Sequence, residues 1–211
     1  MMLGVNLMSR TEEVRAFTAA NLAALKYFTV DSNILVALVA IIYLCYEIAL
    51  AKGKIKALPK MLHLVRLAAA TGVALTMLVT ACFLIPQFGS HWYILYIDNN
   101  FFFHLTVPLL SVIAFIFFED TTQDQNQHKK LSLKDSIFGI TPMALYAVFY
   151  TINVFVHLGN GEPLKTYDWY NFLNGKVLNA LIAIPSMLIV TWGISLALWA
   201  GNRKVVGKNK S

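Results

Sequence analysis

His104 is the residue whose type and position most directly suggest chemistry. It lies in the apolar run from Phe101 to Leu110, where its imidazole would sit about one turn inside a membrane-spanning helix. Ionisable side chains at membrane depth cost free energy, so their presence indicates a functional site. A neutral imidazole is also suited to accept a proton near pH 7. Pro108, one turn further on, is expected to kink the helix or widen the bundle.

Other polar side chains are expected on the same side of the membrane as His104. They are Asp98, Asn99, Asn100, His157, Tyr167, Asp168, Trp169, Tyr170 and Asn171. The asparagines could donate hydrogen bonds to a substrate, or could serve as helix caps and polar contacts between helices. His91, His104 and His157 with Asp98 or Asp168 lack the close helical spacing of a zinc site, so no metal is predicted.

The elements that position these residues are predicted to be membrane-spanning helices. Of the 211 residues, 58% are apolar and only 13% are charged, which is typical of a polytopic membrane protein. We therefore expect an all-α integral membrane bundle in a single domain, with five transmembrane helices and an N-terminal amphipathic helix. The expected spans are residues 30–51, 62–85, 100–118, 137–157 and 177–200, each long enough to cross about 30 Å as a helix.

Basic residues predict the orientation of these spans, because short cytoplasmic loops are enriched in Lys and Arg. Three basic regions alternate with loops that are almost free of these residues; they hold Lys52, Lys54, Lys56, Lys60 and Arg66, then Lys129, Lys130 and Lys134, then Arg203, Lys204, Lys208 and Lys210. The N-terminus is therefore predicted outside and the C-terminus in the cytoplasm. The net charge of +6 is explained by this topology and by attraction to anionic lipids, and no nucleic-acid partner is expected.

The cytoplasmic side offers no obvious chemistry. Its loop from Glu119 to Lys134 reads as a polar connector, and His63 and His128 are interpreted as interfacial or solvated. The motifs of soluble enzymes, such as Gly-x-Ser-x-Gly, His-Glu-x-x-His or a phosphate-binding glycine loop, are absent, and no cofactor is predicted. Chemistry, if present, must be assembled from different spans.

The segment before the first span sets the depth of Thr29 relative to His104. Residues 12–28 have a modest helical amphipathic pattern, and could lie on the outer membrane face or extend the first span. If the first span ends at Ala51, Thr29 and His104 differ in depth by roughly 12 Å at 1.5 Å per residue. If Glu47 already lies at the headgroups, the mismatch largely disappears and Asp31 and Asn33 are buried. We favour the second register because it leaves Glu47 in water.

Short motifs carry a family resemblance. The run Lys26-Tyr27-Phe28-Thr29-Val30-Asp31-Ser32-Asn33-Ile34-Leu35, followed by Asn99-Asn100 and by His104-x-x-Val107-Pro108, resembles the androgen-induced-gene and androgen-dependent-inhibitor family. The Phe-Thr-Val-x-Ser-Asn form is closer to the uncharacterised prokaryotic relatives of that family. The animal members are multi-span hydrolases of fatty acid esters of hydroxy fatty acids, with a Thr nucleophile and a His partner. The resemblance, over about thirty residues, assigns these roles to Thr29 and His104.

One departure from the family is clear. Its members typically have six spans, with a further hydrophobic helix ahead of the one that bears the Thr, whereas residues 1–28 here are too short and too charged for a full span. A missing helix would leave a cavity open to lipid on one side.

The motif form and the short loops favour a bacterial plasma membrane.

The chemistry that the resemblance implies has specific requirements. A threonine hydroxyl is a weak nucleophile and needs a base within hydrogen-bonding reach. Asn33, Asn99 or Asn100 could stabilise an oxyanion, Asp31 or Asp98 could orient His104, and His157 and Tyr170 could support the site. The partner would be a membrane lipid substrate, and the oligomeric state is left open. The alternative is a non-catalytic membrane sensor, lipid-binding or scaffold protein with an external polar pocket.

Overall fold

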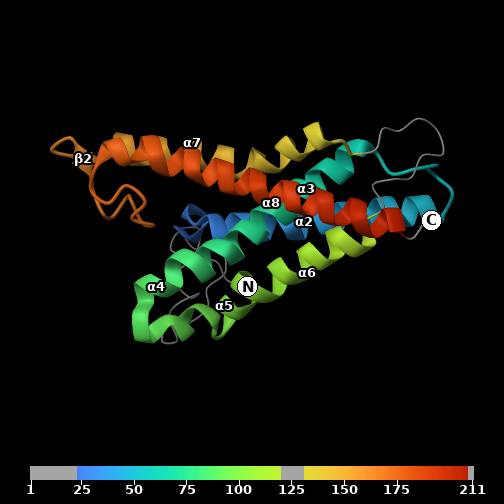
Figure 1. Ribbon diagram of the computed structural model, residues 1–211, viewed down its shortest axis with the longest axis horizontal. Helices are drawn as coiled ribbons and strands as arrows, with labels where there is room; N and C mark the ends of the chain where they lie inside the picture. Colours follow the sequence, from blue (N-terminus) through green and yellow to red (C-terminus); the bar gives the residue numbers. More distant parts are fainter. Residues whose placement is uncertain (1–22, 120–130, 209–211) are drawn as a thin grey trace.

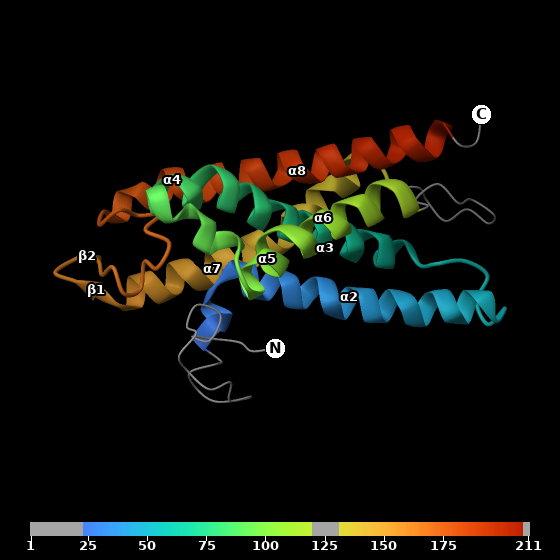
Figure 2. The same cartoon turned by 90° about the horizontal axis from the view of Figure 1, so that it is seen from below.

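The computed structural model describes residues 23–119 and 131–208, and these are mostly helical. Five helical segments are long and apolar enough to cross a membrane; they are Phe28–Ala51, Lys60–Tyr96, Asn99–Phe118, Leu133–Val156 and Val177–Val206. Figures 1 and 2 show them running between two ends of an elongated bundle. The end at which the first segment begins, toward the left of Figure 1, is called the Thr29 end, and the end at which that segment finishes, toward the right, is called the Glu119 end.

The first two segments pack closely because small residues face each other. A 3₁₀ turn, η2 (Ala23–Lys26), leads into α2 (Phe28–Ala51), and α3 (Lys60–Val79) follows a short connection. A Cβ built on Gly72 of α3 would lie 3.4 Å from the Ser32 Cβ of α2, so the two backbones approach closely. The Ser32 and Thr76 hydroxyls lie 3.1 Å apart across this contact. Leu67, Val73 and Leu75 are fully buried, which makes α3 the central helix.

The second segment continues beyond α3 at the Thr29 end. A π-helical turn, η3 (Thr80–Leu84), is followed by α4 (Ile85–Phe88) and by a 3₁₀ stretch, η4 (Gly89–Tyr96). Gly89 has φ +52°, a left-handed conformation that favours glycine. The chain reverses here into the third segment.

The third segment changes helix type around its proline. It consists of α5 (Asn99–Phe101), the π-helical turn η5 (Phe102–Thr106), α6 (Val107–Ile113) and a second π-helical turn, η6 (Ala114–Phe118). Pro108 has no N–H to donate to the carbonyl four residues earlier, that of His104, and its ring crowds that carbonyl. A widened turn relieves this conflict, which explains why η5 ends two residues before Pro108 and contains His104.

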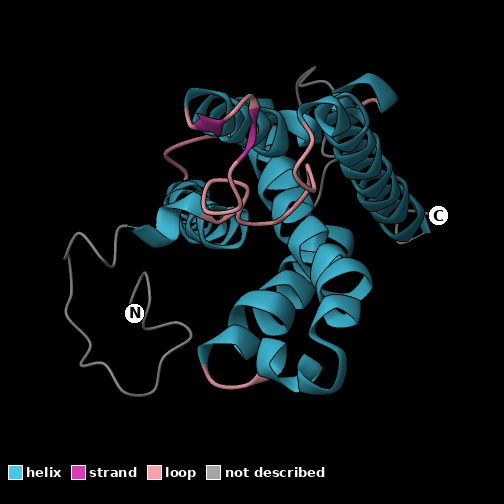
Figure 3. Cartoon of the chain, turned by 90° about the vertical axis from the view of Figure 1, so that its left-hand side faces the viewer, coloured by secondary structure: helices cyan, strands magenta, loops and turns pink. Residues whose placement is uncertain are grey.

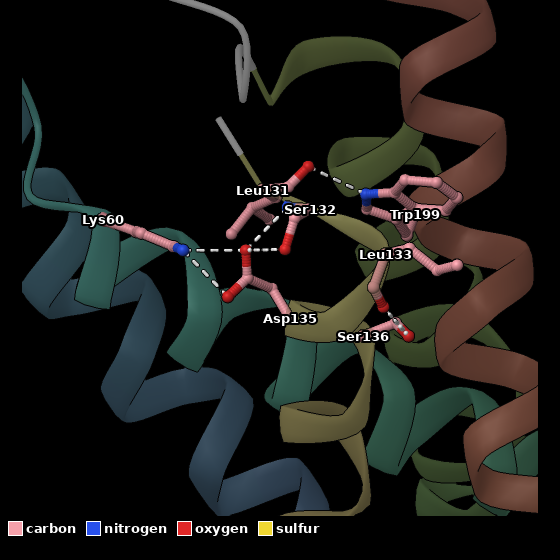
Figure 4. Close-up of polar contacts among 7 residues, drawn as sticks. All are labelled: Lys60, Leu131, Ser132, Leu133, Asp135, Ser136 and Trp199. Carbon is pink, nitrogen blue, oxygen red and sulfur yellow. Dashed lines mark hydrogen bonds and ion pairs between the residues drawn. The ribbon is translucent and has the colours of Figure 1, made fainter. Parts of the chain in front are cut away.

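The fourth segment begins with a well-formed cap. A 3₁₀ stretch, η7 (Leu133–Ile140), leads into α7 (Thr141–Val156). The Asp135 carboxylate accepts hydrogen bonds from the Ser132 backbone N–H at 2.6 Å and the Ser132 hydroxyl at 2.9 Å. Lys60 Nζ, from the start of α3, lies 2.8 Å from the same carboxylate. Figure 4 shows this group, together with the hydrogen bond of 3.0 Å from Trp199 Nε1 to the Leu131 carbonyl.

The fifth segment follows a long connection at the Thr29 end. This connection contains a short antiparallel pair, β1 (Leu158–Gly159) and β2 (Glu162–Pro163), which is drawn in magenta in Figure 3. We call residues 157–176 the end loop. A 3₁₀ turn, η8 (Val177–Asn179), then precedes α8 (Ala180–Lys208), which runs along α7 (Figure 1).

The predicted spans correspond to these five segments with shifted limits. The first begins at Phe28 rather than residue 30, and the second continues to Tyr96 rather than ending at residue 85. The two-residue strand pair is an addition to the expected all-helical architecture. Most of the predicted N-terminal helix lies outside the described residues, and its described part forms the η2 turn. Large apolar side chains cover the exterior, with Leu178 75% and Phe149 72% exposed, a surface that a bilayer would solvate.

Candidate functional site

Thr29 lies in the first turn of α2 and is half-buried. Its carbonyl oxygen accepts a hydrogen bond from Asn33 Nδ2 at 2.7 Å and one from the Ser32 hydroxyl at 3.2 Å. Both donors come from the next turn of the same helix, which fixes the backbone around Thr29. Ser32 and Asn33 are only 2% and 6% exposed, so this turn is held within the bundle.

His104 is buried in η5 with one ring nitrogen satisfied. Its Nδ1 lies 2.8 Å from the carbonyl oxygen of Leu95, which belongs to η4. A carbonyl oxygen can only accept, so Nδ1 must carry the proton, and this leaves the lone pair of the neutral ring on Nε2. The group that orients Nδ1 is thus the Leu95 carbonyl, and not the carboxylate of Asp31 or Asp98 that the sequence suggested. A neutral His104 has the tautomer that a general base acting through Nε2 requires.

Asn33 joins the Thr29 turn to the His104 turn. Its Nδ2 donates to the Thr29 carbonyl and also to the Phe103 carbonyl, the latter at 3.3 Å. One amide nitrogen reaches both oxygens, so α2 and η5 are in contact at this level. Thr29 and His104 therefore lie on turns that are in contact, and not at clearly different heights in the bundle. The depth of Glu47 relative to the headgroups stays a prediction. Within residues 23–119 and 131–208, no direct hydrogen bond joins Thr29 to His104.

The predicted oxyanion donors differ in their surroundings. Asn33 uses its amide on the two carbonyls, while its buried Oδ1 has no hydrogen-bond partner among the described residues. Asn100 is 6% exposed and donates from Nδ2 to the Ile94 carbonyl at 3.1 Å, which holds η4 against α5. Asn99 is exposed on the surface. The side-chain amides of Asn33 and Asn100 thus donate hydrogen bonds to backbone carbonyls.

Tyr170 of the end loop faces the start of α2. Its hydroxyl lies near the Thr29 side chain and near the backbone N–H groups of Phe28 and Thr29. The first N–H groups of a helix have no partner within the helix, so a phenolic oxygen there is a suitable acceptor. Burial raises the pKa of Tyr170 to about 12, and the neighbouring donors oppose this shift. Tyr170 is therefore neutral at pH 7 and has a hydroxyl hydrogen to donate.

The end loop is anchored by buried polar contacts that the sequence did not reveal. Asp168 is 2% exposed, and its carboxylate accepts hydrogen bonds from the Tyr150 hydroxyl and from the Leu173 backbone N–H. Trp169 Nε1 donates to the Tyr146 hydroxyl at 3.0 Å, and that hydroxyl donates to the Lys26 carbonyl at 2.7 Å. Tyr146, Tyr150 and Trp169 thus connect the end loop to α7 and η2. The loop is held over the turn that carries Thr29.

His157 has a local role at the end of α7. Its Nδ1 lies 2.8 Å from the Asn153 carbonyl, and its ring stacks on Tyr167 with centroids 3.9 Å apart. It therefore caps the helix and supports the end loop. Among the residues that the structure describes, no group of three His, Cys, Asp or Glu side chains is placed to hold a metal ion.

Two cavities lie beside the Thr29 turn. A small cavity of about 20 Å³ is bounded by α2, α3, α7 and the end loop, and Thr29, Thr76, Thr80 and Tyr170 are on its wall. A larger groove of about 580 Å³ lies between α2 and α7, is open on one side, and is otherwise mostly apolar; its polar residues are Lys26, Asp31, Ser32, Tyr146, Tyr150, Asn153 and Trp169. Phe28 and Tyr146 line both cavities and so stand between them.

A second polar cluster lies at the Glu119 end. The Glu119 side chain is fully buried; its Oε1 is hydrogen-bonded to His63 Nδ1, and Arg66 Nε lies 2.8 Å from its Oε2. The Arg66 guanidinium also lies 3.9 Å from the centre of the Tyr43 ring, and Asn202 Nδ2 donates to the Glu119 carbonyl at 2.6 Å. Glu119, expected to belong to a polar connector, is thus buried, and His63, expected to be interfacial or solvated, is half-buried beside it. His128 and residues 120–130 of that loop lie outside the described residues. The spacing of His63 and Arg66 on one helical face was the available signal.

The fold and this site define a helical protein with five segments long and apolar enough to cross a membrane, and with a hydroxyl- and histidine-bearing site at one end of the bundle. No family model, curated protein or solved structure matches the chain.

Proposed function

We propose that this protein is a membrane-embedded hydrolase of lipid esters. Its substrate is an ester in which a fatty acid is bonded to the hydroxyl group of a hydroxy fatty acid. Thr29 is the nucleophile and His104 the base, near the outer leaflet of a bacterial plasma membrane, with the N-terminus outside and the C-terminus in the cytoplasm. The proposal combines the resemblance to the androgen-induced-gene and androgen-dependent-inhibitor family with one structural observation. Asn33 bonds the carbonyls of Thr29 and Phe103 with a single amide, so the two reacting residues belong to neighbouring turns.

The reaction follows from the chemistry of these groups. The Thr29 hydroxyl oxygen attacks the ester carbonyl carbon while His104 Nε2 accepts the hydroxyl proton. The tetrahedral intermediate collapses as the bond to the alcohol oxygen breaks, and His104 returns the proton to that oxygen. An acyl group is then left on Thr29. Closing a hydrogen bond between Thr29 and His104 requires α2 to move relative to η5 when substrate binds.

The oxyanion needs a hydrogen-bond donor close to Thr29. The amides of Asn33 and Asn100 are bonded to backbone carbonyls, whereas the Tyr170 hydroxyl faces Thr29 and is neutral at pH 7. We therefore assign Tyr170 as the donor that stabilises the developing negative charge. Asn33 and Asn100 position the turns, and His157 supports the loop that carries Tyr170.

The groove between α2 and α7 is suited to the acyl chain of the substrate. Its volume of about 580 Å³ is within the usual range of small-molecule sites, about 300 to 1,000 Å³, and its open side would face the bilayer. Asp31 on its wall would contact the polar part of the lipid. Phe28 and Tyr146 stand between the groove and the Thr29 cavity, so these side chains must move to connect the two during turnover.

The decisive test is covalent labelling of the purified protein in detergent by a fluorophosphonate, with cleavage of a fatty acid ester of a hydroxy fatty acid in parallel. Thr29→Ala and His104→Ala should each abolish both signals while the variants stay folded. Thr151→Ala, a half-buried threonine of α7, and His91→Ala, an exposed histidine, are the matched controls and should retain them. A folded parent that neither reacts with the probe nor cleaves the ester would contradict the proposal.

The second candidate is a non-catalytic lipid-binding, sensor or scaffold protein. The observation in its favour is that Thr29 is not on the wall of the large groove, so a lipid could occupy the groove without meeting the nucleophile. This candidate predicts that lipids raise the unfolding temperature of the protein without being cleaved. It also predicts that Asp31→Asn weakens this stabilisation, whereas Thr29→Ala leaves it unchanged.

A further inference from the structure

The small cavity beside Thr29 has the dimensions of a site for one water molecule. Its volume is about 20 Å³, and a single water requires roughly 10 to 15 Å³ measured in the same way. Hydroxyl-bearing residues from three parts of the fold lie on its wall: Thr29 from α2, Thr76 and Thr80 from the second segment, and Tyr170 from the end loop. A buried water typically makes two to four hydrogen bonds, which such a wall can supply.

Thr80 supplies the clearest sign of a ligand. The residue is 1% exposed, and its Oγ1 has no hydrogen-bond partner among the described residues. Two other buried threonines bond back to their own helix, Thr76 to the Gly72 carbonyl and Thr191 to the Met187 carbonyl. A buried hydroxyl without a partner is destabilising, so a hydroxyl on a water-sized cavity is expected to bind water.

We propose that this cavity holds one water molecule, bound by the Thr80 hydroxyl, and that this water hydrolyses the acyl group on Thr29. The second part rests on the proposed function. The water oxygen forms a bond to the acyl carbonyl carbon as His104 Nε2 accepts a water proton. The bond between that carbon and Thr29 Oγ1 then breaks, Oγ1 takes the proton from His104, and a free fatty acid leaves. Thr80 is a positioning residue, since it acts through the water.

The kinetic test separates acylation from deacylation. Thr80→Val keeps the shape of the side chain but removes the hydroxyl, so the burst of alcohol release should persist while steady-state turnover falls about tenfold, the effect of roughly 1.4 kcal/mol. Intact-protein mass spectrometry of the quenched reaction should show an accumulated acyl adduct. Thr80→Ser should restore turnover. Equal losses in the burst and in steady-state turnover, or no loss in either, would overturn the assignment.

Thr71→Val is the matched control. Thr71 lies on the same helix, is fully buried, and also has an Oγ1 without a partner among the described residues, but it is not on the wall of this cavity. Its substitution should leave both kinetic phases unchanged.

A high-resolution experimental structure distinguishes the water site from the hydrolase. The water site is supported if the parent shows density for one water within hydrogen-bonding distance of Thr80 Oγ1 and Thr80→Val does not. This holds even if the protein cleaves no ester; the hydrolytic role of the water then fails together with the proposed function. A parent without such density overturns the inference whatever its activity.

Discussion

The side-chain amide of Asn33 donates a hydrogen bond to the backbone carbonyl of Phe103 at 3.3 Å. This contact spans seventy residues of sequence and joins α2 to the π-helical turn that holds His104. A π-helical turn displaces its carbonyls from the regular pattern, which leaves one available to a neighbouring helix. The arrangement of the candidate site thus depends on one amide as well as on the two reacting residues.

Replacement of Asn33 by alanine should destabilise the protein. The variant loses the hydrogen bonds to the Thr29 and Phe103 carbonyls, and we expect the free energy of unfolding to fall by about 1 to 3 kcal/mol. Asn33→Asp should cost more, because a buried carboxylate would face two carbonyl oxygens. Unfolding by SDS titration from detergent micelles measures the loss. Asn99→Ala, at an exposed position, should change it by less than about 0.5 kcal/mol; equal losses for the two alanine variants would contradict this role.

Replacement of Glu119 by alanine should be more damaging still. It leaves Arg66 and His63 without the carboxylate that they share in a buried site, and removing one partner of a buried ion pair typically costs about 3 to 5 kcal/mol. The same SDS titration measures it. Glu162→Ala removes an exposed carboxylate that, within the described part of the chain, accepts from the Val177 N–H, and should cost about 1 kcal/mol or less. Similar losses in both variants would show that burial of Glu119 does not matter.

The long segments could be predicted from sequence because their signal is strong and local. Hydropathy located all five, and the spacing of His104 and Pro108 correctly indicated a disturbed helix at that level. The limits shifted because helices continue through weakly apolar residues when neighbours pack on them. The second segment, for example, extends through Gly89 to Tyr96 as α4 and η4.

The contacts that build the site could not be predicted because they join distant parts of the chain. The bond from Asn33 to Phe103 and the burial of Asp168 by Tyr150 depend on how helices are rotated about their axes. Glu119 is instructive, since a carboxylate that ends an apolar run normally reaches water. It is buried because His63 and Arg66 extend from α3 to meet it, and single-sequence patterns do not show which basic residues face inward.

Tyr170 should make the stability of the protein sensitive to alkaline pH. Burial raises its pKa to about 12 in the folded state, whereas an unfolded tyrosine has a pKa of about 10. The contribution of neutral Tyr170 to the free energy of unfolding is complete below pH 10 and is lost as the pH rises toward 12. Over this range Tyr170 loses its proton in the unfolded chain but keeps it in the folded chain, which favours unfolding. Tyr170→Phe should therefore lose less stability than the parent over this window.

Unfolding midpoints of the parent and of Tyr170→Phe between pH 9 and pH 12 measure this difference. The other eight of the nine tyrosines are common to both proteins, so their contributions cancel in the comparison. A difference between the two proteins that stays constant with pH would rule out a raised pKa at Tyr170.

Gly139 allows the closest approach between η7 and α8. A Cβ at this position would lie 2.6 Å from the Ser195 Cβ and 3.0 Å from Thr71 Oγ1, and the Ser195 hydroxyl, which donates to the Ser136 carbonyl at 2.7 Å, would clash with it. Gly139→Ala should therefore lower the free energy of unfolding by about 1 to 3 kcal/mol, as overpacking typically does. Gly193→Ala is the matched control, because no atom lies within 4 Å of a Cβ there. Since alanine favours helix over glycine, this control should be neutral or stabilising by up to about 1 kcal/mol. Opposite signs for the two substitutions in one SDS titration series would identify Gly139 as a packing contact between η7 and α8; matching signs would contradict that role.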